Sequence, residues 1–375
     1  MAPVELNMES SSGVRRRMTP SYRYTVSCQL QDEEWDSFLS RTPGGHHVQS
    51  SLWGQVKAAF RWKVVRIVVR EQDEIVGGAQ ILLRRILPGT LGIVSKGPVL
   101  SSDDPALSAF MNDALVRVGR ELGIGCLVVQ PPNNGSLQAQ CLEVLGFEPM
   151  TMEVAPTATV QIDLQQDLDD ILGAMRKQTR RDLRHALREG VCGRDGGEHD
   201  LGTFYRLLSA TSRRTKWPVY PECYYGEILR VFGPRARIFF SEYGGQAVSC
   251  QMLISFGDTV VAKNSGWSGE FKSLAPNVVL EWTSIQWAKA NGYRYYDLEG
   301  IAPKVALSRL GLKVDQEATD QWCHYKFKYG GELKMFPKAH IYHLTPLGQW
   351  VYRNILAGIE KGPLGRNIMS LIRLR

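Results

Sequence analysis

A run of alternating lysine and aromatic residues, HYKFKYGGEL, occupies residues 324–333. The alternation predicts a β-strand that ends in a Gly-Gly turn, with the aromatic side chains on one face and Lys326 and Lys328 on the other. Lysines on an exposed edge strand commonly discourage pairing with another sheet. A lysine that instead faces a cleft would hold negative charge on a substrate or on a reaction intermediate.

A second concentration of charge lies in RKQTRRDLRHALR, residues 176–188, which carries seven cationic or histidine side chains. Helical spacing places Lys177, Arg181, Arg184 and Arg188 on one face. Such a face is either solvated or in contact with nucleic-acid phosphates, and charge alone does not decide between the two. The formal net charge of +7 favours an anionic partner, which is nucleic acid, a phosphorylated substrate or an acidic membrane surface.

Other kinds of catalytic centre are not indicated by the sequence. The seven cysteines are scattered without a CxxC pair, which argues against a zinc site or a disulfide framework and fits a reducing cytosol. The pairs His46-His47 and His340/His343 have no third ligand nearby in sequence, so we expect no metal. The sequence also lacks a nucleophile elbow and a Cys/His signature, so covalent catalysis is not expected.

The elements that must position these residues repeat one order along the chain. A length of 375 residues predicts two domains of ordinary size. In each half, helices, antiparallel strands, a further helix and a last strand follow one another, and a Gly-rich turn beside a similar strand recurs in EIVGGAQILL (74–83) and GGQAVSCQMLI (244–254). This pattern predicts an α+β fold with two mixed sheets. Residues 1–21 are expected to form a disordered tail without a signal peptide.

Six stretches of the sequence carry a family resemblance. In chain order they are VQSSLWGQVK (48–57), SKGPVL (95–100), MRKQTRRDLRHALREG (175–190), LLSATSRRTKW (207–217), AKANGYRYYDLEGI (288–301) and YKFKYGGE (325–332). Together they resemble the FemAB family of non-ribosomal peptidyltransferases, which transfer amino acids from aminoacyl-tRNA onto peptidoglycan precursors. The fifth stretch is similar to the family segment Ala-Lys…Gly…Tyr-Asp-Phe-Gly-Gly-Ile, and the sixth to Phe-Lys-x-x-Phe-Gly-Gly. The loop RRTKW departs from the family's Arg-Asp-Gly-Phe, and HALREG lacks the usual lysine.

The resemblance implies a tandem pair of GNAT-like acyltransferase domains. Domain 1 would span residues 22–160, bind the acceptor substrate and be completed by a C-terminal helix over residues 340–375. Domain 2, residues 161–339, would face the aminoacyl-tRNA. The chain has no room for the long coiled-coil arm of larger members, so it resembles the short form that acts on a soluble nucleotide-linked precursor, and a lipid-linked precursor remains open.

The resemblance also assigns residues. It places Lys326 where the motif lysine stabilises the tetrahedral oxyanion and Tyr325 where the motif has phenylalanine, with Lys328 as the alternative if the alignment slips. Lys57 and Arg214 match positions that bind the acceptor diphosphate, although sequence alone favours a solvated helix flank for Lys57 and allows a C-terminal helix cation for Arg214. Arg213 is the alternative to Arg214. Further substrate contacts are implied for Trp53 and Gln49, and tRNA contacts for Arg176, Lys177, Arg180, Arg181 and Arg184.

The implied reaction is aminolysis of an already activated ester, which needs positioning and charge stabilisation but no enzyme nucleophile and no cofactor. Acyl-CoA use is disfavoured because GEFKSLAPNVVLEW (269–282) lacks the glycines of a pyrophosphate-binding loop. Two alternatives stay open. One is a related transferase that makes a small peptide-like metabolite or modifies a surface polymer, and the other is a non-catalytic tRNA- or membrane-binding protein.

The expected partners are aminoacyl-tRNA and a nucleotide- or lipid-linked muropeptide. We expect a monomer in the cytoplasm, in peripheral contact with the inner face of the membrane if the precursor is lipid-linked.

Overall fold

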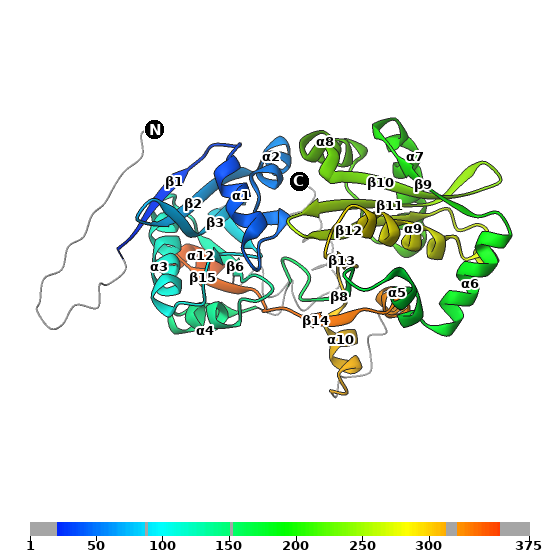
Figure 1. The fold of residues 1–375 in the computed structure, drawn as a ribbon. Helices are drawn as coiled ribbons and strands as arrows, with labels where there is room; N and C mark the ends of the chain where they lie inside the picture. The colour runs from blue at the N-terminus through cyan, green and yellow to red at the C-terminus, as the bar shows by residue number, and fades with distance from the viewer. Residues whose placement is uncertain (1–20, 87–88, 151–152, 313–320, 353–375) are drawn as a thin grey trace, which may run out of the picture. The chain divides into compact units, whose positions relative to one another are not determined.

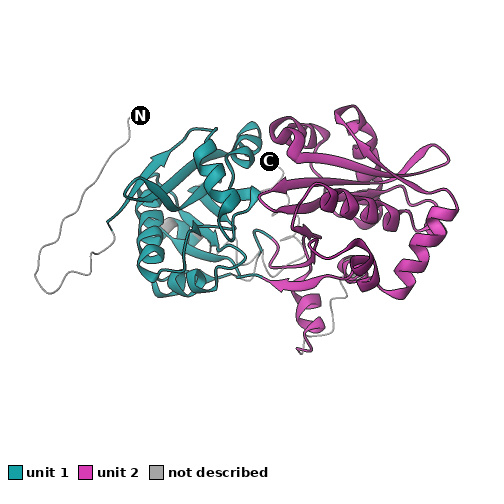
Figure 2. Cartoon of the chain, viewed as in Figure 1, with its two compact units in different colours: residues 1–155, 336–375 teal, residues 156–335 magenta. Residues whose placement is uncertain are grey.

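The computed structural model describes residues 21–86, 89–150, 153–312 and 321–352. The chain divides into two compact units, of which unit 1 comprises residues 1–155 and 336–375 and unit 2 comprises residues 156–335 (Figure 2). The sequence boundaries had been placed a few residues later, at 160/161 and 339/340. The expected tail and most of the expected C-terminal helix lie outside the described residues.

Unit 1 is built around a mixed sheet in the order β1-β2-β3-β4-β6-β15-β7, with β5 paired to β3 (Figure 1). All pairs are antiparallel except β4 and β6, which run parallel from the Leu91–Cys126 pair to the Ser95–Gln130 pair and are connected through α3. The elements are β1 (Tyr22–Ser27), α1 (Glu33–Arg41), η1 (His47–Gln49), α2 (Ser51–Ala59), β2 (Lys63–Glu71), β3 (Glu74–Ile86), β4 (Gly89–Ser95), β5 (Val99–Leu100), α3 (Pro105–Glu121), β6 (Cys126–Gln130), α4 (Ser136–Val144), β7 (Glu148–Pro149), β15 (His340–His343) and α12 (Pro346–Val351).

Unit 2 has a seven-stranded sheet in the order β14-β8-β13-β12-β11-β10-β9 within the described residues. Its parallel pair is β12 and β13, connected through α9. The elements are β8 (Ala158–Asp163), α5 (Leu168–Ala174), α6 (Lys177–Arg188), β9 (Cys192–Gly196), η2 (Glu198–Asp200), α7 (Leu201–Thr215), α8 (Glu222–Phe232), η3 (Gly233–Arg235), β10 (Ala236–Tyr243), β11 (Gln246–Phe256), β12 (Thr259–Trp267), η4 (Lys272–Leu274), α9 (Pro276–Ala290), β13 (Tyr295–Asp297), α10 (Pro303–Arg309), α11 (Gln321–His324), η5 (Tyr325–Tyr329) and β14 (Glu332–Met335).

Helices cover both faces of the unit 2 sheet (Figure 1). Because successive strand residues point to opposite faces, Phe239 and Leu253 join one core cluster with α9 residues such as Ile285. On the other face, the thiol of Cys250 on β11 lies 3.6 Å from the carbonyl oxygen of Phe204 on α7. Both units therefore contain a parallel strand pair that is joined by one helix, which explains the repeated order in the sequence.

The structure corrects two local predictions. Residues 325–329 form a 3₁₀ helix rather than a strand, and the strand begins only at Glu332, after Gly330 and Gly331 with φ of +79° and +84°. A 3₁₀ helix brings residues three apart to the same side, so both Lys326 and Tyr329 are buried, at 7% and 1% exposed. Residues 340–343 form strand β15 rather than part of a helix, because their backbone completes the sheet between β6 and β7.

Candidate active site

Backbone carbonyl oxygens of unit 2 hold the ammonium of Lys326 in place. Its side chain donates to the backbone carbonyl oxygens of Glu299 and, at 2.8 Å, of Gly300. Burial lowers the pKa of Lys326, and the negative charge of Glu299 is the largest influence that opposes this shift. An ammonium that two carbonyl oxygens hold in place is a fixed positive charge, as stabilisation of an oxyanion requires.

The neighbours of Lys326 in η5 have different environments. Tyr325 is 40% exposed, and its ring meets that of Tyr329 edge-on with centroids 6.4 Å apart. The ammonium of Lys328, the alternative motif lysine, lies 5.0 Å from the ring centroid of Tyr329 and 6.0 Å from that of Tyr325. Burial lowers the pKa of Lys328 as well. The two lysines therefore differ in their partners, since Lys326 is bound to backbone carbonyls and Lys328 packs on aromatic rings.

The turn that holds Lys326 follows strand β13. Asp297, 6% exposed, accepts hydrogen bonds from the hydroxyl of Thr159 at 2.6 Å and from the backbone N–H of Glu299 at 2.7 Å. The carboxylate of Glu299 forms an ion pair with Lys263 at 2.5 Å, and each of these two side chains is 19% exposed. This region therefore fixes several charges close together by hydrogen bonds.

A buried carboxyl group, that of Glu281 on α9, lies in the same part of unit 2. It is 5% exposed and accepts hydrogen bonds from the phenol of Tyr296 at 2.5 Å and from the amide of Gln251 at 3.4 Å. Burial raises the pKa of Glu281, while the charges of Lys326 and Lys328 act in the opposite direction. Glu281 is thus a buried acid whose charge state is coupled to both lysines of the motif.

In unit 1, Trp53 and Lys57 lie one turn apart on α2. The helix starts at the N-cap Ser50, whose hydroxyl accepts from the backbone N–H of Trp53. The ammonium of Lys57 lies 5.1 Å from the centroid of the Trp53 ring, and the two residues are only 8% and 7% exposed. The alternative of a solvated helix flank for Lys57 is therefore wrong, and a buried lysine of this kind is a candidate for binding an anionic group.

Gln49 has a structural role, which corrects the prediction that it binds substrate. Its amide nitrogen donates to the backbone carbonyls of Ser95 at 2.7 Å and Gln80 at 3.3 Å, and its oxygen accepts from the backbone N–H of Gln80 at 2.7 Å. The residue is 1% exposed. Both amide N–H groups are used, so Gln49 joins β3 to the end of β4 and offers no further donor to a ligand.

Arg214 ends α7 as an exposed residue whose guanidinium is anchored. It donates to the backbone carbonyls of Ser268 at 2.8 Å and Trp267 at 2.5 Å, and to the hydroxyl of Thr211 at 3.2 Å. It also lies 5.1 Å from the centroid of the Trp267 ring. These contacts attach α7 to the end of β12. Arg213, the alternative, is also exposed, and the proposed phosphate contact remains a prediction for both.

The basic helix α6 follows the predicted pattern with one exception. The predicted tRNA contacts Arg176, Lys177, Arg181 and Arg184 are exposed, as is Arg188. Arg180 is half-buried and donates to the carbonyls of Gly173 at 2.6 Å and Met175 at 2.5 Å, so it holds the end of α5 against α6. The exposed members remain available to bind an anionic partner, whereas Arg180 is committed to the fold.

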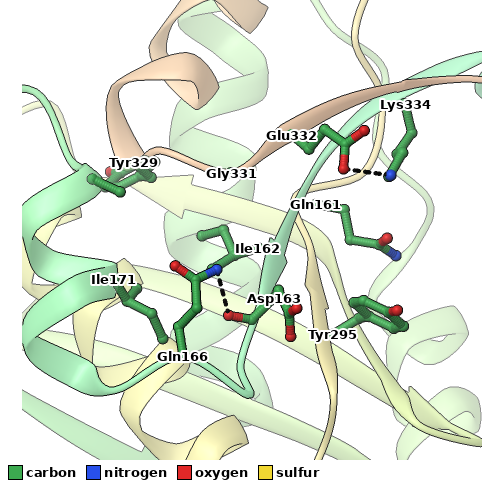
Figure 3. A pocket seen from close by; sticks show the side chains of 11 residues that line it. Gln161, Ile162, Asp163, Gln166, Ile171, Tyr295, Tyr329, Gly331, Glu332 and Lys334 are labelled. Carbon is green, nitrogen blue, oxygen red and sulfur yellow. Dashed lines mark hydrogen bonds and ion pairs between the residues drawn. The ribbon is translucent and has the colours of Figure 1, made fainter.

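A cavity of about 390 Å³ opens at the β14 edge of the unit 2 sheet and is lined by residues of β8, β14 and α5 (Figure 3). None of the predicted site residues lines it, although Tyr329 forms part of its wall. The ion pair between Lys334 and Glu332, 2.5 Å long, spans one side of it. Its lining residues are Gln161, Ile162, Asp163, Gln166, Ile171, Ala174, Tyr295, Tyr329, Gly331, Glu332 and Lys334.

Several residues of chemical interest were missed in the sequence. Lys96, within the SKGPVL stretch, is 3% exposed with a φ of +55°, and its ammonium lies 4.0 Å from the centroid of the Phe336 ring. The motif stretches contain Lys96 and Glu299, but no motif marks Lys263 or Glu281. Lys263 pairs with Glu299 and Glu281 accepts from Tyr296, and both partners are distant in sequence.

The thiol of Cys126 lies beside a histidine but is not a nucleophile at neutral pH. Its sulfur is 3.6 Å from Nδ1 of His343, and burial raises the pKa of this thiol to about 11, so that it is protonated at neutral pH. No group of three metal-ligating side chains occurs among the residues in the structure. Within the same described ranges, every helix is too short or too polar to cross a membrane.

This arrangement is similar to that of several known proteins. A model of the acetyltransferase (GNAT) domain matches residues 173–304, which lie within unit 2. Lipid II:glycine glycyltransferase from Staphylococcus aureus (strain MRSA252) is 26% identical over 198 residues, which cover 49% of this chain and 47% of that protein. The crystal structure of FemX superposes with a TM-score of 0.75 at 19% identity and covers 87% of this chain and 98% of that one. The chain is thus similar to lipid II:glycine glycyltransferase in sequence and to FemX in fold.

The comparisons also confirm the predicted fold. A tandem GNAT protein from the clavulanic acid biosynthesis pathway matches with a TM-score of 0.52 at 10% identity, covering 87% of this chain and 99% of that one. Two GNAT-like domains, each with a mixed sheet, therefore make up the chain. The chain spans about half the length of the curated relatives it matches, so what those relatives act on is considered below as a proposal.

Proposed function

We propose that this protein is an aminoacyltransferase, which moves an amino acid from aminoacyl-tRNA to a peptide amine of a peptidoglycan precursor. The observation that carries the proposal is the buried ammonium of Lys326, which is bound to the carbonyl oxygens of Glu299 and Gly300 and which the resemblance matches to the motif lysine. The relationship to lipid II:glycine glycyltransferase supports the same class of reaction.

In the proposed reaction the acceptor amine attacks the carbonyl carbon of the aminoacyl ester. A C–N bond forms, the carbonyl oxygen becomes an oxyanion, and the C–O bond to the tRNA ribose then breaks. The amine loses a proton and the ribose hydroxyl gains one, so the products are an amide and uncharged tRNA. Lys326 stabilises the oxyanion without forming a bond to it, and a lost donor of this kind typically costs about 3–4 kcal/mol, or a factor of about 10² to 10³ in kcat.

The acceptor is proposed to bind through unit 1. Lipid-linked and nucleotide-linked muropeptides both carry a diphosphate, for which a lysine supplies a point charge and an arginine a bidentate contact. Lys57 is the proposed diphosphate ligand because it is buried beside Trp53. Arg214 stays a predicted phosphate contact by itself, and the exposed cations of α6 are proposed to contact the tRNA backbone.

The test is a transfer assay with the purified protein. Glycyl-tRNA, or a pool of charged tRNAs, is incubated with lipid II or with UDP-MurNAc-pentapeptide, and the products are weighed by mass spectrometry. We expect a new peptide bond on one of these acceptors. No product with any charged tRNA and either acceptor would contradict the proposal, and release of coenzyme A from acetyl-CoA would establish an acyl-CoA transferase instead.

Two variants separate the motif lysines. Lys326→Met is expected to lower kcat about 10² to 10³-fold while tRNA binding is unchanged. Lys328→Met is the matched control, since it removes a lysine two residues away that packs on aromatic rings, and we expect it to retain activity within about tenfold. The reverse order of effects would assign the role to Lys328. A wild-type protein that binds tRNA and forms no product would be a binding protein.

A further inference from the structure

Two irregularities of the backbone meet beside Lys326, and the first lies in β12. Met252 of β11 is paired with Asn264, whereas the next residue, Leu253, is paired with Ala262. Lys263 is therefore the extra residue of a β-bulge. Bulges of this kind redirect a side chain and interrupt the regular ladder, and they are common next to active sites.

The second irregularity is the conformation of Glu299. Its φ is +38°, in the left-handed region that residues other than glycine rarely adopt, and Gly300 follows with a φ of +64°. The local sequence is Tyr-Asp-Leu-Glu-Gly-Ile over residues 296–301, so a glutamate takes a conformation that suits glycine. Strained residues of this kind cluster at functional sites.

The two irregular residues bind each other. The parallel ladder of β12 and β13 ends with the pair Val261 and Asp297. Lys263 and Glu299 each follow this last pair by two residues in the sequence. Their side chains form the 2.5 Å ion pair, with each 19% exposed. The ion pair therefore links the two strands just beyond the point where their backbone pairing stops.

The same turn holds Lys326. Two consecutive left-handed residues direct their carbonyl groups to one side, and the carbonyl oxygens of Glu299 and Gly300 both accept from the Lys326 ammonium. The other end of the turn is fixed by Asp297, which accepts from the backbone N–H of Glu299 at 2.7 Å. The position of the ammonium thus depends on the turn, and the turn is attached to β12 through the Glu299 side chain.

We propose that Lys263 and Glu299 are positioning residues, whose ion pair holds the 299–300 turn so that its carbonyl oxygens seat the ammonium of Lys326. The consequence for catalysis rests on the proposed function, but the seating of the lysine does not. The first experiment therefore uses no substrate, and its outcome is independent of whether transfer is observed.

The charges that face Lys326 come from several elements. They are those of Glu299, of Glu281 on α9 and of Asp297 at the end of β13, together with the thiol of Cys323 on α11. Glu299 contributes the largest of the influences that raise the pKa of Lys326 against the lowering by burial. Removing its charge should therefore move the titration of Lys326 to lower pH.

The first experiment follows the Cε resonance of Lys326 by ¹³C NMR of lysine-labelled full-length protein during a pH titration, with the resonance assigned by its loss in Lys326→Arg. We expect Glu299→Gln to titrate at lower pH than the wild type. Glu227→Gln is the matched control, since Glu227 is also 19% exposed and ion-paired within unit 2, with Arg230 at 2.6 Å, and it should leave the titration in place. An unchanged titration in Glu299→Gln would overturn the proposal.

Positioning is tested by breaking the ion pair from either side. Glu299→Gly removes the carboxylate and suits the left-handed backbone. Lys263→Met removes the ammonium and retains the Glu299 side chain. We expect the Lys326 Cε signal of both variants to move toward that of an exposed lysine, and Lys263→Arg to restore the wild-type position. Wild-type signals in both of the first two variants would show that the ion pair does not seat Lys326.

In the transfer assay, Glu299→Gly and Lys263→Met are each expected to lower kcat about tenfold to a hundredfold with little change in KM, since misplacement of a catalytic group by about 1 Å has effects of this size. The double variant should be no worse than either single variant, because both break the same contact. The positioning role would be refuted if the two substitutions lowered kcat independently, so that their effects multiplied in the double variant. It would also be refuted if the substitutions changed KM and left kcat unchanged. Should the wild type show no transfer, the NMR result still decides the seating.

Discussion

Glu281 offers a test of the buried charges beneath the candidate site. The Tyr296 phenol, 0% exposed, donates to its carboxyl group at 2.5 Å. Glu281→Ala would remove this acceptor from the buried phenol, and a lost buried hydrogen bond of this kind costs about 1–3 kcal/mol. Loss of one buried methylene adds about 0.8 kcal/mol. We therefore expect Glu281→Ala to lower the free energy of unfolding by about 2–4 kcal/mol.

Glu281→Gln should behave differently because it keeps the shape and the oxygen that accepts from Tyr296, and cannot ionise. Burial raises the pKa of Glu281 above its ordinary value of 4.5, so the folded state binds this proton more tightly than the unfolded state. The stability that Glu281 contributes is therefore fully present below about pH 4.5 and is lost as the pH rises through the raised pKa. Over that range the wild type should lose stability relative to Glu281→Gln.

The assay is equilibrium urea unfolding, followed by tryptophan fluorescence at a series of pH values from acid to neutral. Glu227→Gln is the control, since Arg230 lowers the pKa of Glu227, whose contribution is thus present above about pH 4.5 and lost as the pH falls. Equal destabilisation by Glu281→Ala and Glu281→Gln would refute this reasoning. A difference in the free energy of unfolding between wild type and Glu281→Gln that stays constant with pH would refute it as well.

Further predictions concern the helix, the glutamine and the thiol described above. Replacing the exposed Lys177 and Arg184 together by alanine should reduce the slope of log affinity for tRNA against log salt by about 1.4–1.8, and an unchanged slope would exclude α6 from the interface. Arg180→Ala should instead lower the thermal stability and leave the salt slope unchanged, because its guanidinium binds the carbonyls that end α5. Gln49→Ala should cost about 1–3 kcal/mol in thermal unfolding, through the buried N–H of Gln80 that it orphans, and leave KM for the acceptor unchanged. Cys126, with its thiol pKa of about 11, should resist iodoacetamide at neutral pH in mass-spectrometric labelling, and rapid labelling of the folded protein would contradict its burial.

Much of the architecture could be predicted because turn residues mark its boundaries. The hairpin between β2 and β3 follows from two apolar runs on either side of Gln72 and Asp73, and α9 is marked by Pro276 at its start and Gly292 just after its end. Strand β15 was missed because four residues, His340–His343, carry too short a pattern. Only the backbone of β6 and β7 on either side selects a strand there.

The site could be predicted only as far as the motifs extend. The alternation in residues 325–329 imitates a strand, but the burial of Lys326 and Tyr329 selects the 3₁₀ helix. The motif suggested a ligand at Gln49, whereas the backbone groups of Gln80 and Ser95 use its whole amide. In both cases the deciding partners are distant in sequence, so no local pattern reports them.

Lys263 and Glu299 illustrate a more general limit. A bulge in the middle of an apolar strand and a glutamate in the left-handed region both oppose local preference, so sequence rules that rely on preference assign neither of them. Departures from local rules in a folded protein collect where function requires them. Here two such departures, far apart in the sequence, meet in one 2.5 Å ion pair beside a buried ammonium. Their meeting is the physical reason to include the turn at 299–300 in the proposed active centre and not to regard it only as the end of a strand.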